Sequence, residues 1–65
     1  MTITLNGQPH PTEASTIGQL LTELGLNEKP VVIEHNQTAL LKHEHPTTPL
    51  SDSDQLEIIT LAAGG

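Results

Sequence analysis

The residues best suited to chemistry in this 65-residue sequence are the last four, Ala62, Ala63, Gly64 and Gly65. None of their side chains is larger than a methyl group, and the terminal carboxylate is their only charge. Four extended residues reach about 13 Å, and glycine adopts backbone conformations that are closed to other residues. Such a segment can enter a narrow channel and present the Gly65 carboxylate in the active site of another enzyme.

A carboxylate presented in this way can be activated and can then carry sulfur. Attack of the Gly65 carboxylate on the α-phosphate of a nucleotide gives an acyl-adenylate, and a sulfur nucleophile that displaces the nucleotide leaves a thiocarboxylate. The sequence has no cysteine, so it has no thiol to hold sulfur as a persulfide. A frayed end is the more ordinary explanation of Gly-Gly alone, but its place directly after a predicted strand favours the carrier.

Size and charge argue against several other functions. A chain of this length buries only about 60% of its unfolded surface, which leaves little room for the pocket of an independent enzyme. The net charge of −6 argues against nucleic acid and anionic membranes, and it permits a basic protein partner. The sequence shows neither a membrane span nor a signal peptide. We therefore expect a cytoplasmic protein that is monomeric when free.

Residues 1–5 alternate apolar and threonine side chains, which predicts a half-buried strand. Asn6-Gly7 predicts a tight hairpin turn, because both central residues of that turn need positive φ. The returning strand, residues 8–12, carries Pro9 and Pro11. Proline cannot donate to a neighbouring strand, so this strand is expected at a sheet edge.

A helix is predicted to begin at Ser15 or Thr16. Thr16 and Gln19 fit a capping box, in which each side chain satisfies a free backbone donor. Gly25 fits the position that ends the helix, and Gly18 could allow the helix to pack closely on the sheet. One apolar helical face is formed by Ile17, Leu20, Leu21 and Leu24.

Three further strands are predicted, at residues 31–35, 39–41 and 55–61, with a loop at 42–49 and a turn at 52–54. One helix crossing a mixed sheet of four to five strands gives an α+β roll. In this order the first and last strands pair in parallel at the centre. The prediction is one domain, residues 1–61, and a flexible tail, residues 62–65, with an aliphatic core of Ile3, Leu5, Ile17, Leu20, Leu21, Leu24, Ile33, Leu40, Leu50, Leu56 and Ile58.

Over its whole length the chain resembles the ThiS-type sulfur carriers of thiamine biosynthesis, within the ubiquitin-like β-grasp superfamily. No single motif is decisive; their order, spacing and length together are specific. The resemblance rests on the segments 3–7, 16–21, 31–36 and 50–58 and on the terminal Ala-Gly-Gly.

The resemblance implies that a ThiF-type adenylating enzyme activates Gly65 with ATP, that a cysteine desulfurase often supplies the sulfur, and that thiazole synthase takes it. No cofactor would be bound stably. The sequence departs from the family at Ser53, where glycine is common, and near Ala62, where larger residues are common. If position 53 needs positive φ, serine costs about 1 kcal/mol there.

Two other groups of residues are candidates for binding. Glu57, Ile59 and Leu61 should face away from the helix and could form a partner-docking face, unless a loop covers them; strand parity leaves Val32 ambiguous. The segment 43–45, His-Glu-His, could present two imidazoles to a metal, but no third ligand is near in sequence. These histidines are expected to be solvated loop residues.

Two other functions stay open for the same fold. One is a sulfur carrier for molybdopterin or another product, although such chains tend to be longer and often have a larger residue or proline before Gly-Gly. The other is a ubiquitin-like modifier or plain binding module, which would form isopeptide adducts or function without its last glycine.

Overall fold

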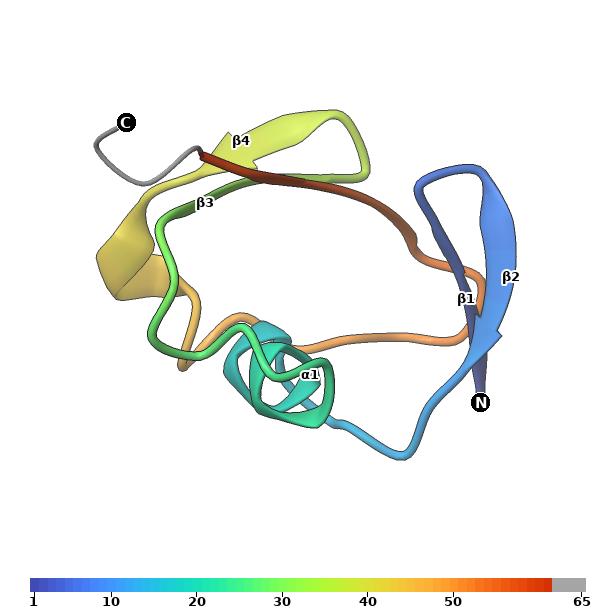
Figure 1. Ribbon diagram of the computed structural model, residues 1–65. Coiled ribbons are helices and arrows are strands. Elements are labelled where there is room, and N and C mark those ends of the chain that lie inside the picture. The colour runs from blue at the N-terminus through green and yellow to red at the C-terminus, as the bar shows by residue number, and fades with distance from the viewer. Residues whose placement is uncertain (62–65) are drawn as a thin grey trace.

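The computed structural model describes residues 1–61, in which one α-helix packs on a five-stranded mixed sheet with the strand order β2-β1-β5-β3-β4. Figure 1 shows the sheet curving over the helix, with the β1–β2 hairpin at one end. The predicted α+β roll with a β-grasp topology is confirmed. The elements are β1 (Thr2–Leu5), β2 (Gln8–Pro11), α1 (Ile17–Glu23), β3 (Val31–His35), β4 (Thr38–Leu40), a 3-10 helix (Lys42–Glu44) and β5 (Gln55–Thr60).

The central pair of strands is the predicted one. β1 and β5 run parallel, with Thr4 opposite Gln55 and Leu5 opposite Leu56, and β5 runs antiparallel to β3 on its other side. The proline-bearing β2 lies at one edge, as expected. The strand that leads to the C-terminal residues is therefore the central strand of the sheet and is paired on both sides.

The core lies between the helix and one face of the sheet and is entirely aliphatic. Ile3, Ile17, Leu20, Ile33 and Leu56 are each less than 2% exposed. Three residues that the sequence placed in the core, Leu5, Leu24 and Leu40, are only partly buried, and Ala14 joins the core unpredicted. The remaining buried apolar residues are Leu21, Leu50 and Ile58.

The capping box is formed differently from the prediction. The Gln19 N–H donates to Thr16 Oγ1 at 3.1 Å, as expected. The Gln19 side chain does not return to Thr16; its Oε1 accepts from the N–H of Ser15 at 2.7 Å and from the Ser15 hydroxyl at 2.8 Å. Ser15 offers two donors to one oxygen, which explains the shift by one residue. Gly25 follows the helix at φ +75°, as predicted.

Gly18 allows close packing, but against a loop and not against the sheet as expected. Its N–H donates to the His45 carbonyl at 2.8 Å, and a Cβ at this position would lie 3.0 Å from Pro46 Cα. The loop therefore lies directly on the first turn of α1. The 3-10 helix within this loop was not predicted, and β4 begins one residue early because Asn36 and Gln37, at φ 50° and 72°, make a two-residue turn.

The same loop buries His45, contrary to the expectation of a solvated residue. His45 is 7% exposed, and its Nε2 has no hydrogen-bond partner among the described residues. Burial lowers the pKa of His45 below its ordinary value of 6.5, and it outweighs the opposing effects of a hydrogen bond with the Leu40 backbone and of the Glu44 charge. A charged imidazole would carry an unsatisfied N–H in this site.

Ser53 has a φ of +72°, so the turn does require the conformation that glycine adopts most readily. Its N–H donates to the Thr2 carbonyl at 2.9 Å, and the Thr2 N–H donates to Asp52 Oδ1 at 2.9 Å. These bonds hold the turn against β1 and fix the start of β5. Serine therefore carries conformational strain at a position the fold needs.

Replacement of Ser53 by glycine should raise the free energy of unfolding by up to about 1 kcal/mol, because the left-handed conformation then meets no Cβ. Urea denaturation measures the change. The matched control is Ser51→Gly: Ser51 has no positive φ, so the substitution should lower stability by about 0.5–1 kcal/mol through the unfolded chain. If both variants lost the same free energy of unfolding, Ser53 would not be a strained residue.

The buried His45 predicts that stability falls on mild acidification. The unfolded chain takes up a proton near pH 6.5, whereas the folded chain resists protonation to a lower pH. Stability is thus full above 6.5 and declines as pH falls below it. Urea denaturation between about pH 8 and pH 5 measures this decline. His45→Gln should remove much of this loss of stability, whereas His43→Gln, at an exposed residue, should leave the loss unchanged. If His45→Gln lost as much stability as wild type on acidification, burial of His45 would not be the cause.

Candidate functional site

The candidate site begins where β5 ends. Val31 pairs with Thr60, and one residue further the Leu61 N–H donates to the Pro30 carbonyl at 2.9 Å. Backbone hydrogen bonds to β3 and to the residue before it therefore hold the chain in place up to its last described residue. The predicted tail, Ala62, Ala63, Gly64 and Gly65, lies outside the described residues, so the division at residue 61 stays a prediction.

Asn6 holds β5 from the other side, a role that sequence reasoning missed. Its Oδ1 accepts from the Ile58 N–H at 2.8 Å, and its Nδ2 donates to the Ile58 carbonyl at 3.2 Å. The side chain thus continues the β1–β5 pairing beyond the end of β1. The Asn6-Gly7 signal predicts the turn, but nothing local indicates a contact with a residue 52 positions away.

The docking face predicted from β5 is exposed. Leu56 and Ile58 point into the core, while Glu57 and Ile59 lie on the outer side, and Ile59 is 59% exposed. Leu61 follows β5, is 50% exposed and lines a hollow with Leu21 and His45. Use of these residues for docking remains a prediction, but the orientation of Glu57 and Ile59 is as expected.

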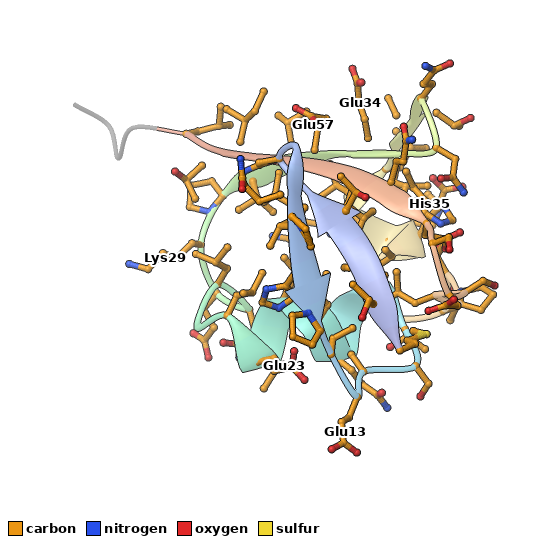
Figure 2. The ribbon with its side chains drawn as sticks, turned by 90° about the vertical axis from the view of Figure 1, so that its right-hand side faces the viewer. Glu13, Glu23, Lys29, Glu34, His35 and Glu57 are labelled. Atoms are coloured by element: carbon orange, nitrogen blue, oxygen red, sulfur yellow. The ribbon has the colours of Figure 1, made fainter. Side chains whose placement is uncertain are left out.

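The register of β3 and β5 shows on which face of the sheet Val32 lies. Val32 lies directly opposite Ile59 and is 44% exposed, so it belongs to the same face. The next outward pair along the two strands is Glu34 and Glu57. Figure 2 shows both glutamates on the side of the sheet away from the helix. We call Val32, Glu34, Glu57 and Ile59 the outer face.

His35 and Asp54 form a hydrogen bond that supports the turn before β5. The two side chains are 2.7 Å apart, between His35 Nε2 and Asp54 Oδ2. Partial burial acts to raise the pKa of Asp54, but hydrogen bonds from His35, from the Ser51 N–H and from Asn36 together lower it below its ordinary value. The carboxylate ties β3 to the turn, and its role is structural.

The segment 43–45 does not form a metal site in the described chain. His43 is exposed, His45 is buried, and Glu44 Oε1 accepts from the Leu41 N–H at 2.7 Å. Among residues 1–61 no three histidine or acidic side chains gather closely enough to hold a metal ion. Within the same residues, no helix has the length and apolar character needed to cross a membrane.

Positive charge gathers where β5 ends. The sequence has two lysines and no arginine, and both lysines, Lys29 and Lys42, line a hollow of about 190 Å³ that Leu61 also lines. Acidic residues are close to both lysines in sequence, since Glu28 precedes Lys29 and Glu44 follows Lys42 by two positions. The hollow is therefore not a purely basic site.

Comparison with known proteins gives consistent matches. Residues 3–65 match the model of the ThiS family. The sulfur carrier protein ThiS of Thermus thermophilus is 41% identical over 61 residues, which cover 94% of this chain and 95% of that protein. A thiazole synthase of Magnetococcus marinus is 35% identical over 66 residues, all of this chain but 20% of the synthase. The crystal structure of thiamine biosynthesis protein ThiS from Geobacter metallireducens has a TM-score of 0.82 at 26% identity, over the whole of both chains.

Proposed function

The chain belongs to the ThiS family, and on this basis we propose that it is a sulfur carrier of thiamine biosynthesis whose sulfur is held at Gly65. The observation that carries the proposal is the family match, which extends through Gly64 and Gly65. The relatives named for thiamine biosynthesis also favour this pathway over the molybdopterin and modifier alternatives.

The chemistry has two steps at one carbon. The Gly65 carboxylate attacks the α-phosphorus of ATP, so that a C–O–P linkage forms and pyrophosphate leaves. Hydrosulfide or an equivalent sulfur nucleophile then attacks the activated carbonyl carbon, and AMP leaves with its electron pair. The product is a thiocarboxylate, and no oxidation or reduction is needed when the sulfur enters at the sulfide level.

In this proposal the chain is a protein cosubstrate and not an enzyme. A ThiF-type adenylating enzyme supplies the nucleotide site, and thiazole synthase accepts the sulfur. Where a cysteine desulfurase supplies the sulfur as a persulfide, a thiol must reduce the resulting acyl disulfide, so that the thiocarboxylate is released and the thiol ends as a disulfide. The similarity of the whole chain to one fifth of a thiazole synthase supports contact with that enzyme. No cofactor need bind the carrier itself, and its location in the cytoplasm stays a prediction.

The fold suits a carrier because it separates the reactive end from the part that must be stable. β5 is fixed by β1, by β3 and by the side chain of Asn6, so the point from which the tail departs is well positioned. The small tail residues then need only to fit the partner's channel.

Deletion of Gly65 should abolish sulfur loading. The variant still ends in a glycine carboxylate, but that group falls about 3.5 Å short of the wild-type position, a displacement that costs a positioned reaction 100-fold or more in order of magnitude. The purified protein is incubated with the adenylating enzyme, ATP and a sulfur source, and its intact mass is recorded.

Wild type should gain the mass of one oxygen replaced by sulfur, and fragmentation should place the change at Gly65. Ser51→Gly, a substitution remote from the tail, serves as the control and should load normally. Loading of the deletion variant at the wild-type rate, or sulfur found on a side chain, would refute the assignment of Gly65.

A further inference from the structure

We propose that the outer face docks on thiazole synthase by receiving one guanidinium group of that enzyme between the carboxylates of Glu34 and Glu57. The inference rests on the proposed function, because it takes thiazole synthase as the enzyme that accepts the tail. It adds a specific chemistry of recognition: an arginine of the partner with apolar side chains beside it.

The first support is the register of β3 and β5. Glu34 and Glu57 lie directly opposite each other in an antiparallel pair, where Cβ atoms are about 4.5–5.5 Å apart. Like charges in this arrangement repel and destabilise a sheet. Two carboxylates at this separation and on one side of the sheet can accept from the several N–H groups of one guanidinium.

The second support is that the pair is not neutralised within the described chain. The acid–base contacts among residues 1–61 are the histidine–carboxylate pairs His10–Glu23 and His35–Asp54. Neither Glu34 nor Glu57 takes part in a side-chain hydrogen bond there, and both are exposed. The two lysines lie elsewhere: Lys29 precedes β3 and Lys42 is in the 3-10 helix. The two carboxylates are therefore free to accept a cation from another molecule.

The third support is the group of exposed apolar residues beside the two glutamates. Val32 and Ile59 form the neighbouring outward pair, and the half-exposed Leu61 follows at the end of the strand. Along a strand the acid pair is about 7 Å from Ile59 and about 13 Å from Leu61. An enzyme that encloses the tail beyond Leu61 will cover Ile59 and Val32 before it reaches the acids.

This setting favours arginine over lysine and a protein over other occupants. The guanidinium is planar, weakly hydrated and able to bond two carboxylates at once, and it tolerates apolar neighbours. A second copy of this chain would bring the same two acids and would be repelled. Thiazole synthase is the favoured occupant because a region like this chain forms part of one such enzyme.

The test measures the affinity of thiazole synthase from the same organism for the full-length carrier by calorimetry. The variant Glu34→Gln/Glu57→Gln should bind about tenfold more weakly or worse, in line with the coupling of close charge pairs across interfaces. Its affinity should also depend less on salt concentration. The control is Glu13→Gln/Glu28→Gln, which changes the net charge equally at two other exposed glutamates; Figure 2 shows Glu13 far from the acid pair.

Thermal unfolding of the free variants separates docking from a structural role. Relief of the repulsion should raise the unfolding midpoint of Glu34→Gln/Glu57→Gln, whereas a structural role for the carboxylates would lower it. Higher stability together with weaker binding supports the proposal. Wild-type affinity in this variant, equal weakening in the control, or no measurable binding of the wild type overturns it.

The proposed function is judged separately, by the mass of wild-type carrier loaded with sulfur by the adenylating enzyme. If wild type is loaded at Gly65 but the glutamine variant binds thiazole synthase as tightly as wild type, the proposed sulfur-carrier function stands and only the proposed arginine site is refuted. Failure of loading would remove the carrier function itself, whatever the binding measurements show.

Discussion

The pairing of β5 with both β1 and β3 is the constraint on which the other features depend. Backbone groups buried in a sheet must find partners, and β5 finds them on both sides. On the β1 side the Asn6 N–H donates to the Leu56 carbonyl at 2.8 Å, and the Asn6 side chain bonds both backbone groups of Ile58. On the other side β5 pairs along its length with β3. Inward, Leu56 and Ile58 complete the aliphatic core. Outward, Glu57 and Ile59 are exposed on the face for which we propose docking. The strand also leads directly to the residues in which we propose that the chemistry takes place.

The sequence predicted those parts of the fold that local chemistry decides. The apolar repeat from Ile17 to Leu24 gave the helix face, the prolines of β2 placed that strand at an edge, and the apolar character of both faces of β5 placed it at the centre. The candidate site was predicted in the same way, since alternation along β5 is enough to turn Glu57 and Ile59 outward. Strain at Ser53 was expected because the family that the chain resembles commonly has glycine there. The φ of +72° at Ser53 confirms the strain.

What the sequence did not predict depends on partners far away in the chain. Opposition of Glu34 and Glu57 follows from the register of β3 and β5, which no local pattern contains. His45 was expected in solvent because polar residues surround it, but the absence of a side chain at Gly18 lets its loop lie on the helix. At Glu34 and Glu57 a rule of sheet stability is broken on an open face, and such violations are expected where a surface serves another molecule.

The central claim, that the C-terminal carbonyl of this chain delivers sulfur into a thiazole, is tested most directly by isotope transfer. Carrier loaded with heavy sulfur and freed of other sulfur sources is mixed with thiazole synthase and its remaining substrates, and the product is analysed by mass spectrometry. The account predicts heavy sulfur in the thiazole ring, in an amount equal to the carrier consumed, with the carrier returned as the carboxylate. A thiazole with ordinary sulfur, or loaded carrier left intact while the ring forms, would contradict it.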